Sequence, residues 1–258
     1  EAMAGLGEDE APSSPAGDFA VLTSMKADVD LPLPRRIKSL KLRVTGIPDQ
    51  KLAVSDVRQK ATWIKTSDKP TVDYAIIAVK PDGKKSAKLP LRAVSLKPFL
   101  AEAPYIQCNH PDIKKQARLI VGKETNAFKA ANKIRAWVQA NMRAQADIGI
   151  VRSSLDVLNN RVGVCRDYAI LYAALARAAG IPTRIVTGLV FTNGSFYYHV
   201  WAESYTGVWT PFDATLNTDF VDATHIKMAQ GDATSMFEVS KAIGGLKAHI
   251  IDYKHLEK

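Results

Sequence analysis

Hydrophobic residues recur with two different periods along this chain of 258 residues. Between about residues 19 and 98 the apolar runs are short and strand-like, as in residues 37–44 and 72–79. From residue 111 onwards, apolar residues recur at helical spacing in segments 111–121 and 126–142. The pattern therefore predicts a small β region followed by a region that begins with helices.

The helical region is expected to end in an antiparallel meander. Residues 165–179 are rich in Ala and Leu, and this helix should stop at Gly180, which precedes Ile-Pro. The period then becomes two, and an Asn-Gly pair, typical of a tight hairpin turn, separates residues 184–191 from 196–205. Another strand is expected at 247–252. Helices followed by antiparallel strands predict an α+β fold.

Composition divides the chain into three expected segments. Residues 1–17 are rich in Ala, Gly, Ser, Pro and acidic residues, which is typical of a flexible leader. Residues 18–100 should form a small β-sandwich-like domain, and residues 101–258 a second domain of helices and strands. The hydrophobic fraction of 47% excludes a disordered chain, and no apolar run is long enough to span a membrane.

The net charge of +9 is concentrated in the β region. Residues 21–100 carry 17 Lys and Arg against 7 Asp and Glu. A basic surface could suit nucleic acid, but lysines on solvated strands account for the same composition. We therefore expect no nucleic-acid partner.

One cysteine has a sequence context that suits a nucleophile. Cys165 follows Gly163-Val164 at the expected start of a helix, where unpaired N–H groups and the helix dipole favour a thiolate. His199 lies in the middle of an expected strand, and Asp213 ends the next one, so the carboxylate could orient the imidazole. Each residue alone could be structural, but their order along the chain favours a catalytic set.

Four sequence blocks carry a family resemblance. They are Gly163-Val164-Cys165, the segment RAAGIP at 177–182, HVWAE at 199–203 and WTPFDAT at 209–215. Together they closely resemble the bacterial transglutaminase-like superfamily, whose pattern is G-x-C, R-x-x-G-I-P, H-x-W-x-E and W-x-x-x-D-x-T. The tail at 221–232 also looks like bacterial members, so the resemblance covers about residues 105–253.

The resemblance implies a papain-like fold for residues 101–258 and a catalytic triad of Cys165, His199 and Asp213. It implies acyl transfer through a thioester, with the backbone N–H of Cys165 as one oxyanion donor. Asn141 and Gln145 are candidates by position for the second donor. His225 lies outside the H-x-W-x-E block and after Asp213, and we interpret it as structural.

No cofactor or metal is expected, because five dispersed histidines and two cysteines lack zinc-ligand spacing. The expected partner is a protein or peptide substrate, with hydrolysis by a protease or deamidase favoured over cross-linking. An inactive binding module of the same fold and an enzyme resembling arylamine N-acetyltransferases are the alternatives. The leader and the family resemblance favour a periplasmic or exported bacterial protein, with a monomer as the default.

Overall fold

The computed structural model of the protein describes residues 24–65, 69–80, 82–91, 93–145, 149–240 and 242–257. The expected leader, residues 1–17, lies outside these described residues. Within them, no helix has the length and apolar character needed to cross a bilayer.

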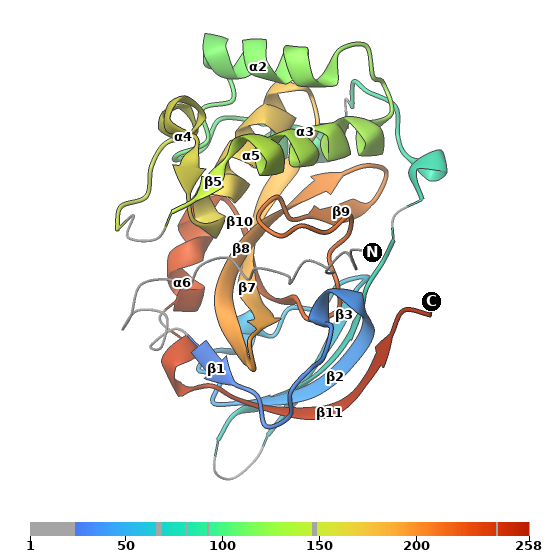
Figure 1. The fold of residues 1–258 in the computed structure, drawn as a ribbon, viewed down its shortest axis with the longest axis vertical. Coiled ribbons are helices and arrows are strands. Elements are labelled where there is room, and N and C mark those ends of the chain that lie inside the picture. Colours follow the sequence, from blue (N-terminus) through green and yellow to red (C-terminus); the bar gives the residue numbers. More distant parts are fainter. Residues whose placement is uncertain are drawn as a thin grey trace, which may run out of the picture.

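Four helices gather at one end of the molecule (Figure 1): α2 (Pro111–Val121), α3 (Ala127–Asn141), α4 (Ser154–Asn160) and α5 (Cys165–Ala178). Helix α5 is the central one, and it packs against the other three as well as against the sheet below. Every residue from Asp167 to Arg177 is buried, as its run of alanine and leucine predicts. The helix ends before Gly180, whose φ of 79° suits a residue without a side chain.

The sheet under α5 contains β1 (Ser24–Lys26), β7 (Thr183–Thr192), β8 (Ser195–Tyr205), β9 (Trp209–Phe212) and β10 (Ile226–Gly231). Strands β7 and β8 form the expected hairpin around Asn193 and Gly194, which both have positive φ. On the other edge of β8, β1 pairs with residues 195–197 and β9 with residues 202–205. Residues 198–201 lie between these two partners, and this stretch contains His199.

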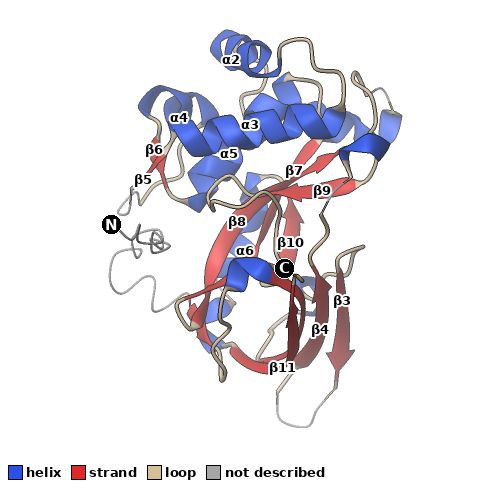
Figure 2. Ribbon diagram, turned by 45° about the vertical axis from the view of Figure 1, so that its right-hand side comes forward, coloured by secondary structure: helices blue, strands red, loops and turns tan. Residues whose placement is uncertain are grey.

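A second sheet lies at the opposite end of the molecule, with the order β11-β2-β4-β3 (Figure 2). Its strands are β2 (Ile37–Thr45), β3 (Gln59–Ile64), β4 (Thr71–Ile77) and β11 (Lys247–His255). Leu40, Leu42 and Tyr74 of this sheet share one buried cluster with Leu189 and Phe196 of the first sheet. The two sheets are therefore layers around a common core.

Three further short elements, two strands and a helix, lie near the site. Strands β5 (Arg143–Ala144) and β6 (Val162–Gly163) pair in parallel immediately before α5. The short helix α6 (Met236–Ser240) follows β10 and packs against β7, β8 and β10. The α+β fold predicted from the hydrophobic pattern is confirmed.

Two strand pairings cross the expected domain boundary near residue 100. Strand β1, from the N-terminal side, pairs with β8, and β11, from the C-terminal side, pairs with β2. Local periodicity cannot reveal pairings between strands separated by some 200 positions. The division at residue 100 stays a prediction. Each side of that position supplies a strand to the sheet of the other side.

Candidate active site

The start of α5 holds Cys165 in a fixed position. The carboxylate of Asp167 accepts a hydrogen bond of 2.9 Å from the backbone N–H of Val164, and it lies 3.4 Å from Nη2 of Arg152. A Cβ on Gly163 would lie 2.5 Å from Cβ of Asp167, so only glycine fits beside this cap. The thiol of Cys165 is half-buried at the positive end of the helix dipole, which favours the thiolate.

His199 and Asp213 form a short, buried pair. The Nε2–H of His199 donates to Oδ2 of Asp213 over 2.7 Å, and the residues are 5% and 2% exposed. The other carboxylate oxygen, Oδ1, accepts a hydrogen bond of 2.7 Å from the backbone N–H of Thr215. Trp201, two positions along β8, stacks on His199 with 6.0 Å between ring centroids. The imidazole is thus held by a carboxylate at one nitrogen and by an aromatic ring at its face.

The charges at this pair stabilise one another. Burial opposes the charged imidazole, but the carboxylate of Asp213 and the sulfur of Cys165 outweigh it and raise the pKa of His199 to about 10. Burial likewise opposes the carboxylate of Asp213, but His199 and His225 together hold the pKa of that carboxyl well below its ordinary value. An imidazolium between a carboxylate and a sulfur favours the thiolate form of Cys165.

The structure thus brings together the three residues that the sequence singles out. Cys165 begins a helix, His199 lies in a strand, and Asp213 follows the next strand. A thiolate beside an oriented imidazolium can attack an amide carbonyl and then supply a proton to the leaving amine. The arrangement is therefore suited to covalent acyl transfer.

A second histidine, which sequence reasoning interpreted as structural, contacts the same carboxylate. The Nε2–H of His225 donates to Oδ2 of Asp213 over 3.2 Å, and the residue is completely buried. His225 precedes β10, a strand that the periodicity of the sequence does not predict. Its position in the tail that resembles bacterial family members is the signal that could have identified it.

The spacing of three side chains at the site resembles that of metal ligands. They belong to His199, Asp213 and His225. Their ligand atoms all lie within 4.8 Å of one another. The two hydrogen bonds to Asp213 account for this proximity without a metal ion. The sequence-based expectation that no metal is bound stays a prediction.

The two side chains considered as second oxyanion donors are placed differently. The side-chain amide of Asn141 donates to the carbonyl of Trp137 over 2.8 Å, at the end of its own helix. The backbone N–H of Gln145 donates to the carbonyl of Gly163 over 2.9 Å, two residues before Cys165, and the Gln145 side chain is exposed. Position therefore favours Gln145 over Asn141 for that role.

A buried charge network adjoins the site on β8. Glu203 lies 2.5 Å from Nζ of Lys227 and accepts hydrogen bonds of 2.9 and 2.7 Å from Arg184. Lys227 also pairs with Asp56, which precedes β3 in the second sheet. The guanidinium of Arg184 lies 4.1 Å from the ring centroid of Trp209. The network therefore ties β7, β8 and β10 to the second sheet.

The two cysteines differ in accessibility, and both are free thiols. Cys108 is 2% exposed, and its sulfur contacts the carbonyl of Leu100 at 3.5 Å. Burial raises the pKa of the Cys108 thiol. An alkylating reagent should therefore react with Cys165 in preference to Cys108.

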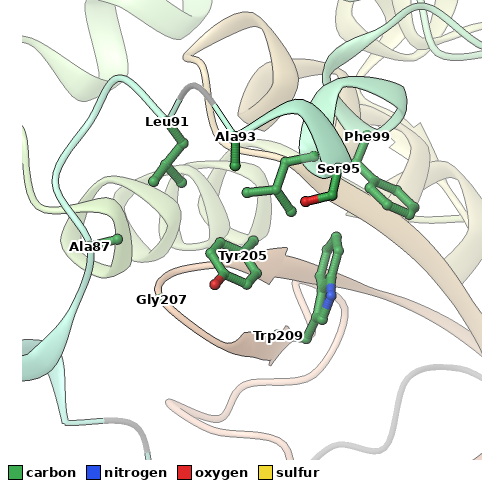
Figure 3. Close-up of a pocket in the computed structure, with 9 residues that line it drawn as sticks. Ala87, Leu91, Ala93, Ser95, Phe99, Tyr205, Gly207 and Trp209 are labelled. Atoms are coloured by element: carbon green, nitrogen blue, oxygen red, sulfur yellow. The ribbon is translucent and has the colours of Figure 1, made fainter.

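A groove of about 490 Å³ lies at the turn between β8 and β9 (Figure 3). Its aromatic walls are Phe99, Tyr205 and Trp209, with Leu91 opposite them. Tyr205 is six residues along β8 from His199, a separation of about 20 Å in a strand. The groove is therefore separate from the cluster around Cys165.

Comparisons with known proteins agree with this architecture. Residues 114–214 match the family model of the transglutaminase-like superfamily, and the match includes Cys165, His199 and Asp213. That segment of the chain is therefore similar to this superfamily. A candidate cysteine protease from Cytophaga hutchinsonii superposes with a TM-score of 0.57 at 21% identity, covering 86% of this chain and 89% of the other. That similarity shows a shared fold.

Part of the chain is also similar in sequence to two uncharacterized proteins. An uncharacterized protein of Haemophilus influenzae is 30% identical over 143 residues, or 50% of this chain and 38% of the relative. A Mycobacterium leprae protein, ML0607, is 26% identical over 111 residues, covering 40% of each chain. The chain therefore spans about two fifths of the length of these relatives.

Proposed function

We propose that this protein is a thiol-dependent amide hydrolase or acyl transferase that acts on protein or peptide substrates. The observation that carries the proposal is the buried hydrogen bond of 2.7 Å between His199 and Asp213, with the imidazole in contact with Cys165. Such a pair holds a histidine in one orientation and keeps it charged. The similarity of residues 114–214 to the transglutaminase-like superfamily supports the same reaction class.

In the proposed reaction the thiolate of Cys165 attacks the carbonyl carbon of an amide. A C–S bond forms, and the carbonyl oxygen becomes an oxyanion that the backbone N–H of Cys165 can stabilise. The imidazolium of His199 gives its proton to the nitrogen as the C–N bond breaks, so that an amine or ammonia leaves. His199 then takes a proton from water, which attacks the thioester and releases the acid and the thiolate.

We favour hydrolysis over cross-linking. Cross-linking needs a dedicated place for a second amine next to the thioester, whereas hydrolysis needs only water. The groove beside Trp209 is about 20 Å from His199 along the strand, too far for an amine bound there to reach Cys165 directly.

We also propose that the protein acts in the periplasm or outside the cell, as the family resemblance suggests, and that it needs no cofactor. Cell fractionation of the natural host with an antibody to the protein would test the compartment. Recovery in the cytosolic fraction would contradict it.

Mass-spectrometric trapping of a thioester is the decisive experiment. The protein is mixed with a panel of peptides and proteins and quenched in acid, and adducts are mapped to Cys165. Cys165→Ala should give no adduct, and His199→Ala should give far less than the natural protein. New amino termini would indicate proteolysis, whereas ammonia release from glutamine peptides would indicate deamidation. No adduct and no turnover over the whole panel would favour the binding module instead.

A further inference from the structure

Oδ2 of Asp213 accepts two hydrogen bonds from two histidines. His199 donates from 2.7 Å and His225 from 3.2 Å, and both donors are Nε2 atoms. Only one of these imidazoles contacts Cys165 in the way that acyl transfer requires. The role of the other imidazole, that of the completely buried His225, remains to be explained.

The surroundings of His225 fix its orientation. Its ring meets Trp201 edge-on with 5.3 Å between centroids, and the centroid of His199 lies 5.7 Å away. On the far side, Nδ1 of His225 lies 3.4 Å from Oδ1 of Asp222. The ring is therefore held between two carboxylates and against two aromatic rings.

Asp222 is in turn held by the N-terminal part of the chain. Its Oδ2 lies 2.9 Å from Nη1 of Arg35, and its Oδ1 accepts a hydrogen bond of 2.8 Å from the backbone N–H of Thr224. Arg35 also donates to the backbone carbonyl of Phe191 in β7. A continuous polar chain thus runs from Arg35 through Asp222, His225 and Asp213 to the candidate base.

We propose that His225 is a positioning residue, which donates to Oδ2 of Asp213 so that this carboxylate stays ionised and aimed at His199. The proposal rests on the proposed function of Cys165, His199 and Asp213. It extends that function by one residue that touches neither sulfur nor substrate. Among the described residues, the other charged or titratable groups near His225 and Asp213 include Asp222, Arg35, His199 and Arg58, which donates to the backbone carbonyl of Asp222 over 2.9 Å.

The physical reason is the cost of a buried carboxylate. A buried anion that loses one of its hydrogen bonds protonates more readily, because burial favours the neutral form. Once Asp213 is protonated, no carboxylate stabilises the imidazolium of His199, which then gives up its proton more readily. The thiolate of Cys165 thereby loses the positive charge that stabilises it. Without His225, the reactive ion pair should therefore disappear at a higher pH than in the natural protein.

The test measures the rate of Cys165 alkylation by iodoacetamide between about pH 3 and pH 9. It needs no substrate, and Cys165→Ala gives the background from Cys108. His225→Phe keeps a ring against Trp201 but removes both nitrogens, whereas His225→Gln retains an N–H donor near the original Nε2. Tyr74→Phe is the control for a general loss of stability, since it removes a buried hydrogen bond of 3.2 Å to the Leu52 carbonyl, in the second sheet.

We expect the acidic limb of the profile to move up by about one pH unit in His225→Phe, which lowers the alkylation rate in the acidic range by about tenfold. At pH 8 the rate should be nearly unchanged. His225→Gln should restore most of the natural profile, and Tyr74→Phe should leave it as it is. If His225→Phe does not fold, Asp222→Asn should give a smaller shift in the same direction.

Two results would overturn the inference. One is a His225→Phe profile that coincides with the natural one. The other is thiol reactivity that falls on dialysis against EDTA and returns with zinc chloride, because His225 would then serve a metal. If instead the natural protein alkylates like free cysteine, with a midpoint near about pH 8.5, the proposed function itself fails.

Discussion

The Nε2 nitrogen of His199 lies 2.7 Å from Oδ2 of Asp213, in surroundings where both residues are almost fully buried. Burial by itself would favour a neutral imidazole, yet the pKa of His199 is raised to about 10 because the carboxylate and Cys165 outweigh that effect. The charge on Asp213 therefore decides the charge on His199. Replacing the carboxylate by an amide of the same shape isolates this contribution.

Asp213→Asn should reduce turnover by about a thousandfold or more, because the amide cannot stabilise the imidazolium. The pKa of His199 should fall from its raised value, so the alkaline limb of turnover, which needs the protonated imidazole, should move to lower pH. The measurement is the pH dependence of Cys165 alkylation, together with turnover of any substrate found by thioester trapping. An unchanged alkaline limb would show that the carboxylate does not control the imidazole.

Asp222 should make the protein sensitive to acid. Burial raises the pKa of this carboxyl, but His225 and Arg35 lower it more, to about 2, against about 3.9 in an unfolded chain. Asp222 thus contributes stability that is present above about pH 4 and is lost as the pH falls towards 2. Urea unfolding between about pH 2 and 6 should give a smaller slope of stability against pH for Asp222→Asn. Asp112→Asn, at an exposed carboxylate, is the control, and equal slopes for both variants would contradict the expectation.

Gly163→Ala should disturb Cys165 without touching it. The new methyl group would lie 2.5 Å from Cβ of the buried Asp167, whose carboxylate caps α5. We expect a lower melting temperature and at least a tenfold loss of thiol reactivity at neutral pH, since the helix start must shift. Gly149→Ala is the matched control, because a Cβ there has nothing within 4 Å. Equal behaviour of the two variants would show that the cap tolerates the displacement.

Lys227→Met should destabilise the whole protein. Lys227 is 1% exposed and pairs with both Glu203 and Asp56, so its removal leaves the buried carboxylate of Glu203 and the partly buried one of Asp56 without this cation. Breaking a buried ion pair in this way costs about 3–5 kcal/mol. Denaturant unfolding measures the loss, with Lys60→Met on an exposed position of β3 as the control. A loss below about 1 kcal/mol would mean that Arg184 alone is sufficient for Glu203.

The sequence predicted elements whose burial pattern is local. Helices α2, α3 and α5 and the hairpin of β7 and β8 occur where periodicity, a proline start and the Asn-Gly turn indicate them. Strand β10 was not predicted because it is short and carries Lys227, a charged residue buried only through partners from other segments. The pairing of β11 with β2 depends on contacts between distant positions and has no local signal.

The residues of the candidate site also differ in whether a local sequence signal indicates them. Cys165, His199 and Asp213 were singled out because a helix start, a strand centre and a strand end suit their chemistry. His225 was interpreted as structural because it lies outside the H-x-W-x-E block and follows Asp213 in the sequence. Its contact with Asp213 arises from the loop around Asp222, which Arg35 holds from the N-terminal half of the chain.

The pairing of β2 with β11 also bears on how the molecule is made. Strand β2 acquires that neighbour only after the ribosome has added residues 247–255, although every side chain around Cys165 has been synthesised by then. Until that moment one border of the second sheet lacks its partner, and Arg35, just before β2, lies next to this unfinished border. The second sheet should therefore be completed only once residues 247–255 have been synthesised, and the contacts that Arg35 makes beside it should form at the same stage.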